Sequence, residues 1–294
     1  MRGLRTEGYT IEAVRHRGYR LVKRPDRLLP LDLTEGLATT SLGRHIHAFE
    51  TLPTTQDVAR RLAEAGAVHG TLVIAEEQSA GRGRLGRGYW CPRGGIWGTV
   101  ILRPALIPAE VQLISLAAGV AIAEGIEAAT GIRTTLKWPN DLQVEGRKLA
   151  GVLTEVEAEE SLVHFVLVGF GINANIPAAA FPPDLCDGAT SLQAATGRPI
   201  ARAALVQRVL ERLEIWCERL TAEGPVPLLA GWRARPNILG RSVRVAHLQR
   251  VWEGVAADLD STGALLLRTA DGALQRVLAG DVTLRSAEGD GGAA

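Results

Sequence analysis

The stretch around which this chain is organised is GRGRLGRGYW, residues 81–90. It opens a run of basic residues with no acid among them, namely Arg82, Arg84, Arg87 and Arg93. The glycines between them lose much conformational entropy on ordering, so a stable helix is excluded. Because guanidinium groups bind anions bidentately, the stretch predicts a mobile anion-binding loop. The apolar run TLVIA at 71–75 predicts a strand that anchors one end of it.

This stretch has two other interpretations. Gly81, Gly83 and Gly86 match a dinucleotide-binding fingerprint, which needs a helix directly after the glycines and an acid about 20 residues further on. Here YWCP and two more glycines follow, and residues 102–104 are LRP, so this fingerprint is disfavoured. A solvated basic loop without a ligand stays open when the stretch is taken alone.

Composition limits the class of protein. The chain has 294 residues, 33 basic and 32 acidic, with a net charge of +1, so nothing global indicates nucleic acid or a membrane surface as partner. The longest apolar run, near 113–123, is shorter than the ~18 residues of a membrane helix. Three widely spaced cysteines predict neither a disulfide framework nor a zinc site. We therefore expect a cytoplasmic protein that does not enter the membrane.

Lysine usage marks a second region. The chain has only three lysines among its 33 basic residues, and two of them, Lys137 and Lys148, lie eleven residues apart. A compact ammonium is not replaced by the planar guanidinium of arginine. Strands at 134–138 and 147–156 are predicted to form a hairpin that brings these two lysines together. Helices are predicted at 109–130 and 201–220.

Three later motifs change the interpretation of the basic loop. They are KWPNDL at 137–142, RKLAGVLTE at 147–155 and GFGINAN at 169–175. With the loop, they resemble the biotin protein ligases (biotin–acetyl-CoA-carboxylase ligases), whose members carry GRGRxGRxW, KWPND, KLAGIL and GxGIN in this order. The resemblance covers about residues 45–285. It implies an α+β fold, with a class II aminoacyl-tRNA-synthetase-like catalytic domain of mixed sheet and helices at 44–235. A small SH3-like β-barrel is expected at 236–286.

The remaining segments are assigned as follows. Residues 1–30 resemble a remnant of a winged helix-turn-helix, because 10–14 and 18–22 predict the two strands of a wing hairpin. The helices that would enter a major groove are missing from it, so we expect no DNA binding by this form. Residues 31–43 are predicted to be a linker, and 287–294 a disordered tail.

The resemblance also implies site residues. Biotin contacts are expected from Thr54, Thr55 and Gln56, where the family has Ser-Thr-Asn, and from Gln78, Arg82, Gly83, Arg84 and Lys148. Contacts with ATP and the adenylate are expected from Arg84, Arg87, Trp90, Lys137, Asn140 and Asn173. The catalytic set is Lys148, Lys137, Arg84 and Asp141. Asp141 would orient or deprotonate an incoming lysine, although a turn aspartate is more often structural.

The implied reaction is a two-step ligation. Biotin and ATP, with Mg²⁺, give biotinyl-5′-AMP, and a lysine of a biotin carboxyl carrier protein then displaces AMP. A carboxylate is already an anion at pH 7, so aligning and binding charge matters more than a strong base. Serine-hydrolase, zincin and P-loop motifs do not occur in the sequence. A lipoate or octanoate ligase and a biotin-sensing transcriptional repressor remain alternatives, a homodimer is open, and metal ligands are not identified.

Overall fold

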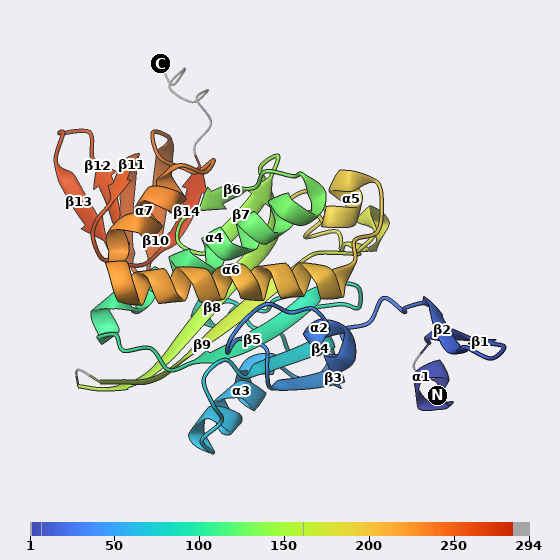
Figure 1. Cartoon of the computed structure of the whole chain (residues 1–294). Helices are drawn as coiled ribbons and strands as arrows, with labels where there is room; N and C mark the ends of the chain where they lie inside the picture. The colour runs from blue at the N-terminus through green and yellow to red at the C-terminus, as the bar shows by residue number, and fades with distance from the viewer. Residues whose placement is uncertain (1, 7, 161, 285–294) are drawn as a thin grey trace.

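The computed structural model describes residues 2–6, 8–160 and 162–284 of the chain. A seven-stranded mixed sheet, in the order β3-β4-β5-β9-β8-β7-β6, forms its centre. Helices α4 and α6 cover one face of this sheet, and α3 lies on the other (Figure 1). The α+β class expected from the sequence is therefore observed. The strands are β3 (Ile46–Leu52), β4 (Leu72–Gln78), β5 (Ile96–Leu102), β6 (Thr135–Lys137), β7 (Asp141–Val144), β8 (Arg147–Glu159) and β9 (Leu162–Ile172).

Strand β4 shows why the basic loop has a fixed base. Its residues alternate between two buried faces: Leu72 and Ile74 join the core under α4 and α6, and Val73 and Ala75 join the core under α3. A strand buried on both faces has a continuous apolar sequence, as residues 71–75 do. The loop that leaves β4 therefore starts from a strand that is anchored in both cores.

The helices follow the apolar patterns of the sequence. They are α2 (Pro30–Thr34), α3 (Thr55–Glu64), α4 (Val111–Thr130), α5 (Leu192–Thr196), α6 (Arg202–Glu223) and α7 (Pro225–Arg233), with 3-10 turns at Arg84–Gly86, Pro108–Glu110 and Ala178–Ala180. Helix α4 is apolar on all sides and packs against α6, which is typical of a core helix. By length and composition Pro108–Thr130 would also suit a membrane span, but 72% of its apolar window is buried inside the protein.

The C-terminal part is a separate five-stranded antiparallel sheet, in the order β13-β12-β11-β10-β14. Its strands are β10 (Ser242–His247), β11 (Arg250–Leu259), β12 (Leu265–Arg268), β13 (Leu274–Val277) and β14 (Asp281–Leu284). It packs beside α7 and the N-terminal end of α4 (Figure 1). The indole of Trp138, in the KWPND turn, donates to the carbonyl of Gly263 over 2.9 Å and joins the two parts. The predicted tail at 287–294 lies outside the described residues.

The N-terminal segment carries a short helix, α1 (Arg2–Thr6), and a hairpin of β1 (Thr10–Val14) and β2 (Gly18–Lys23). The hairpin stands apart from the main sheet (Figure 1). The linker predicted at 31–43 is wrong. Its beginning lies in α2, and Leu33, Leu37 and Leu42 are buried in the main core, where α2 packs on α6. Its leucines, whose burial outweighs the turn-forming residues around them, explain the difference.

Candidate functional site

A cleft of about 820 Å³, open to solvent, lies on the α3 face of the large sheet. The start of α3 forms one wall, the glycine-rich parts of β5, β8 and β9 form the floor, and the loop 81–90 lies over it. The C-terminal sheet contributes Asp281 to its rim. The cleft thus collects segments that lie more than 200 residues apart in the chain.

The turn before α3 is held by a hydrogen-bond network. The backbone N–H of Thr55 donates to Gln78 Oε1 over 2.6 Å, and the hydroxyl of Thr99 donates to that of Thr55 over 2.8 Å. Gln56 Nε2 donates to the carbonyl of Leu153 over 3.0 Å. Within the described part of the chain, the buried Gln56 Oε1 accepts no hydrogen bond. A buried acceptor without a donor is costly, so this oxygen suits an N–H of a ligand.

Glycines keep the floor of the cleft flat. A Cβ at Gly169 would stand 2.9 Å from the amide of Gln56, and one at Gly171 would stand 2.7 Å from the ring of Tyr89. The rings of Tyr89 and Trp97 meet edge to face, with centroids 5.9 Å apart. Backbone and flat rings therefore line this end, which accommodates an apolar, ring-shaped ligand.

Lys148 stands at the other end of the cleft. Its ammonium lies 2.7 Å from Asp141 Oδ1 and 5.3 Å from the centre of the Tyr89 ring. Gly151, which pairs with Asp141 across β7 and β8, leaves room for the lysine. A carboxylate and an aromatic face both stabilise a cation, so Lys148 presents a fixed positive charge to the cleft.

Lys137 lies behind this pair. It faces Asp141 in the register of β6 and β7, and burial, with a further contribution from the charge of Lys148, lowers its pKa. The two lysines are close enough to interact, as predicted, but the simple hairpin is wrong. An additional strand, β7, lies between the strands that carry the two lysines. It pairs with β6, where Asp141 faces Lys137, and with β8, where Gln143 faces Lys148.

Arginines of the loop 81–90 meet acids from distant elements. Arg87 Nη2 lies 2.5 Å from Asp281 Oδ2, and Arg84 Nη1 donates to the carbonyl of Gly280 over 3.1 Å. Burial lowers the pKa of Arg84, with opposition from Asp281. Arg82 pairs with Asp57 of α3. The stretch itself holds no acid, and the partners Asp57 and Asp281 lie far away in the chain.

Some residues assigned to the site do not line the cleft. The Trp90 ring packs on Phe181, with centroids 5.4 Å apart, and the side chain of Asn173 donates to the carbonyl of Thr190. Lys137 is also absent from the lining. Counted without a gap, GRGRxGRxW puts its aromatic at Tyr89, which does line the cleft. The assigned residues that do line it are Thr54, Thr55, Gln56, Gln78, Arg82, Gly83, Arg84, Arg87, Asn140, Asp141 and Lys148.

Two residues that line the cleft, Tyr89 and Asp281, were not assigned to it from the sequence. The motif count could have found Tyr89. No local sequence pattern marks Asp281 as a site residue, because it belongs to a short strand of another sheet. Only tertiary packing brings it to Arg84 and Arg87.

Comparison with known proteins agrees with this arrangement. Residues 48–173 match the Biotin/lipoate A/B protein ligase family, and 238–285 match the Biotin protein ligase C terminal domain. The chain is 40% identical over 282 residues to the bifunctional ligase/repressor BirA of Bacillus subtilis, which covers 96% of this chain and 86% of that protein. It is 35% identical over 240 residues to the biotin--[acetyl-CoA-carboxylase] ligase of Mycobacterium tuberculosis, covering 79% and 86%.

A solved structure shows the same fold. The biotin protein ligase from Aquifex aeolicus, in complex with biotin and ATP, has a TM-score of 0.73 and 28% identity. The match covers 82% of this chain and 99% of that one. With sequence relatives over nearly the whole chain and this structural match, the chain belongs to the biotin protein ligase family.

Proposed function

We propose that this protein is an ATP-dependent biotin–[carboxyl carrier protein] ligase. It activates biotin to biotinyl-5′-AMP and transfers the biotinyl group to a lysine of a carrier domain, such as that of acetyl-CoA carboxylase. The observation that carries this proposal is the division of one cleft into two ends. One end offers flat glycine-lined backbone and Gln56 Oε1, which has no hydrogen-bond donor among the described residues, and the other offers Lys148 and the loop arginines.

In the first step, the biotin carboxylate attacks the α-phosphorus of ATP, and the bond to pyrophosphate breaks. The ureido ring lies at the start of α3, where Gln56 Oε1 accepts one of its N–H groups. Lys148 lies between the carboxylate and the α-phosphate and reduces the repulsion between the two anions. Phosphate oxygens compete with Asp281 for Arg87, whose side chain is exposed, and for the half-buried Arg84.

In the second step, the amine of the carrier lysine attacks the carbonyl carbon of the mixed anhydride, and the bond to AMP breaks. The incoming group arrives as an ammonium, and its proton passes to solvent water before the amine attacks. Asp141 lies between Lys137 and Lys148, so a third ammonium approaching the cleft meets a carboxylate that is already oriented. We assign Asp141 the role of orienting this amine. The loop 81–90 covers the anhydride and limits its hydrolysis.

The ATP enters as its Mg²⁺ complex in this proposal. Mg²⁺ is usually held through substrate phosphates and one or two carboxylates, and keeps several waters. Asp281 is the carboxylate nearest to the loop arginines that bind the phosphates, so it is the residue best placed to meet the ion. The chemistry supplied by Mg²⁺ is neutralisation of charge on the phosphates.

Further parts of the proposal rest on family resemblance. We assign the large sheet to the class II aminoacyl-tRNA-synthetase-like fold and the C-terminal sheet to the SH3-like barrels. Cys91, Cys186 and Cys217 are free thiols, which supports a cytoplasmic location. A homodimer remains a proposal without a defined interface.

The choice of acid separates biotin ligation from its alternative, lipoate or octanoate ligation. A purified biotin carboxyl carrier domain is incubated with the enzyme, MgATP and one acid at a time, and the intact mass of the carrier is measured. We expect a mass increase with biotin only. The matched control is a carrier domain whose acceptor lysine is replaced by arginine, and it stays unmodified. Modification by lipoate or octanoate in preference to biotin would overturn the assignment.

A further inference from the structure

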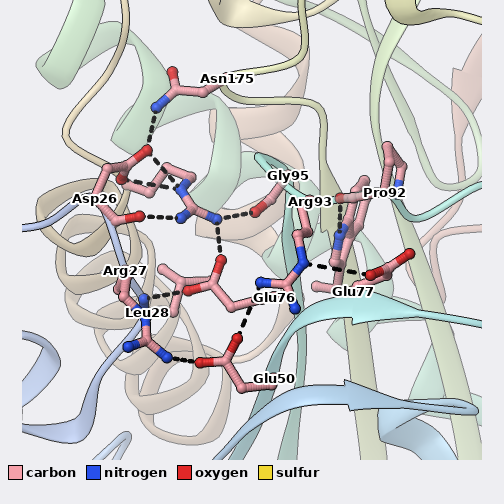
Figure 2. Close-up of polar contacts among 12 residues, drawn as sticks. Asp26, Arg27, Leu28, Glu50, Glu76, Glu77, Pro92, Arg93, Gly95 and Asn175 are labelled. Carbon is pink, nitrogen blue, oxygen red and sulfur yellow. Dashed lines mark hydrogen bonds and ion pairs between the residues drawn. The ribbon is translucent and has the colours of Figure 1, made fainter. Parts of the chain in front are cut away.

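A buried guanidinium lies outside the cleft but contacts segments that shape it. Arg202 is the first residue of α6, and its side chain is 3% exposed. Figure 2 shows its partners Asp26, Glu76 and Gly95 converging from three separate stretches of the chain. Arginine is rarely buried this completely without a full set of partners. Asp26, Glu76 and Gly95 supply such a set here.

The hydrogen bonds of Arg202 reach two segments that enter the cleft. Nη1 donates to Glu76 Oε2 over 2.8 Å and to the carbonyl of Gly95 over 2.9 Å. Glu76 precedes Gln78 by two residues in β4, and Gly95 precedes Trp97 by two residues at the end of the basic loop. Gln78 and Trp97 both line the cleft. One guanidinium thus joins the two strands that carry them.

The same guanidinium holds the N-terminal segment. Its Nε donates to both carboxylate oxygens of Asp26 over 3.0 Å, and Nη2 donates to the backbone carbonyl of Asp26 over 2.6 Å. The backbone N–H of Leu28 donates to Glu76 Oε1 over 2.7 Å, and Arg27 pairs with Glu50 of β3. The stretch 26–28, which follows the β1–β2 hairpin, is therefore bound to the same carboxylate as Arg202.

The end of the basic loop is fixed here by a second residue. Asn175 donates its backbone N–H to the carbonyl of Gly94 over 2.7 Å and its side-chain N–H to Asp26 Oδ2 over 2.7 Å. A Cβ at Gly94 would stand 2.4 Å from the Asn175 carbonyl, so only glycine permits this approach. Two residues, Arg202 and Asn175, thus contact both the loop end and the N-terminal segment.

From this geometry we infer that Arg202 is a positioning residue: it sets Gln78 and Trp97 at the biotin end of the cleft and couples their position to docking of residues 26–28. A buried charge without its partner is strongly unfavourable, so Glu76, Asp26 and Arg202 hold their places together. A lysine cannot copy the fork that reaches three segments. The inference rests on the proposed function, because it needs biotin to bind beside Gln78 and Trp97.

The kinetic test compares two substitutions on the same helix. Arg202→Lys keeps the charge and loses the fork, and Arg208→Lys is the matched control. Arg208 is exposed, and among the described residues it pairs with Glu211 of the same helix. Biotin-dependent pyrophosphate exchange is measured at a temperature where circular dichroism finds both variants folded. We expect Arg202→Lys to raise the KM for biotin about tenfold, with kcat within about threefold, because the biotin end is displaced and the phosphate end is not. Arg208→Lys stays within about twofold of wild type.

A digestion test measures the coupling. Trypsin cuts after Arg27 only when 26–28 leaves its binding site, whereas Arg15, Arg17 and Arg20 of the hairpin are exposed and serve as internal controls. Biotin with MgATP should slow cleavage after Arg27 about fivefold or more and leave the hairpin sites unchanged. Asp26→Ala, which keeps the bonds of Arg202 to Glu76 and Gly95, should abolish this protection. The Asp26→Ala variant also tests the coupling if Arg202→Lys does not fold.

The outcomes separate this inference from the proposed function. Wild-type protein that neither binds biotin nor exchanges pyrophosphate would remove the proposed function. Normal exchange with an unchanged KM in Arg202→Lys would overturn the positioning role. Normal exchange with equal cleavage after Arg27, with and without ligands, would overturn the coupling.

Discussion

At the scale of the residue, Lys148 is held at the cleft by two contacts. Asp141 lies 2.7 Å from its ammonium and the Tyr89 ring lies on another side. Lysine scarcity and the KLAG motif drew attention to this position in the sequence. The Tyr89 contact could not be foreseen, because a loop residue reaches a strand residue only when the loop folds over the sheet.

Replacement of Lys148 tests its charge. Lys148→Ala should lower biotin-dependent pyrophosphate exchange by roughly 100-fold or more, by analogy with loss of one transition-state donor. Lys148→Arg should restore little, because a planar fork replaces a compact ammonium. The neighbouring Arg147→Ala is the control, since Arg147 pairs only loosely with Glu145 at 3.7 Å. Near-normal exchange by Lys148→Ala would refute the assignment.

Tyr89 offers a second test at this scale. Tyr89→Phe keeps the ring below the ammonium, so kcat/KM for biotin should stay within about twofold of wild type. Tyr89→Leu removes the ring and should lower kcat/KM about fivefold or more, from loss of a cation–π contact and of an aromatic pair. Trp90→Leu, next in the chain but packed on Phe181, should change it less. Equal effects of Tyr89→Leu and Trp90→Leu would contradict the placement of Tyr89.

At the scale of the element, the loop 81–90 lies over the cleft through surface ion pairs. The sequence correctly indicated a glycine-rich basic loop between two strands, because glycine and arginine content is a local property. Its acid partners Asp57 and Asp281 come from other elements of the fold, and no periodic pattern in the sequence identifies them. Exposed ion pairs contribute about 0–1 kcal/mol each to stability. They therefore offset the conformational entropy that the loop loses on closing only weakly.

Limited trypsin digestion tests this weak closure. In the free protein, cleavage after Arg82, Arg84 or Arg87 should precede cleavage in the large sheet. Biotin with MgATP should slow it, and MgATP alone much less, because both ends of the cleft must be filled for the adenylate to form. Asp281→Asn should accelerate cleavage in the free protein. Identical rates with and without ligands would mean that closure does not depend on them.

Helix α6 carries a separate pH-dependent anchor at Glu214. Burial would raise the pKa of this carboxyl, but backbone N–H groups of Leu42, Thr40 and Ser41 outweigh burial, and the pKa is lowered. A lowered folded-state pKa contributes stability above the unfolded value, which is lost as the pH falls through the folded value. Glu214→Gln should therefore lower the free energy of unfolding by about 1–3 kcal/mol at pH 7.

Urea unfolding at several pH values measures this contribution. The difference between wild type and Glu214→Gln should shrink as the pH is lowered below about 4.5, the unperturbed range of a glutamate. Glu218→Gln, on the same helix, is the control and should show a small difference at every pH. A constant difference for Glu214→Gln between pH 7 and pH 3 would contradict the role of its charge.

At the scale of the whole molecule, the sequence predicted an α+β fold, the core helices and the C-terminal strands. Apolar periodicity and turn residues carry that information locally. The sequence did not predict the packed segment at 31–43, because its leucines find their partners only on α6. Nor did it predict that the C-terminal sheet reaches the rim of the cleft, since Asp281 meets Arg87 across the boundary between two sheets.

DNA binding belongs to this scale as well. We predict no sequence-specific DNA binding by this 294-residue chain, because the described residues before the β1–β2 hairpin form one helix of five residues and no recognition helix. A gel shift at physiological salt with biotin and MgATP present measures it. Tight binding to one DNA sequence over a scrambled sequence would show the prediction wrong and favour the repressor alternative.

The central claim is that one cleft joins biotin to adenylate, and mass spectrometry tests it most directly. The protein is mixed with biotin and MgATP, without a carrier, and its small-molecule contents are analysed after denaturation. We predict biotinyl-5′-AMP in the wild-type sample and a strong reduction in Lys148→Ala. Wild-type protein that forms no biotinyl-5′-AMP, or forms a lipoyl or octanoyl adenylate instead, would contradict the account.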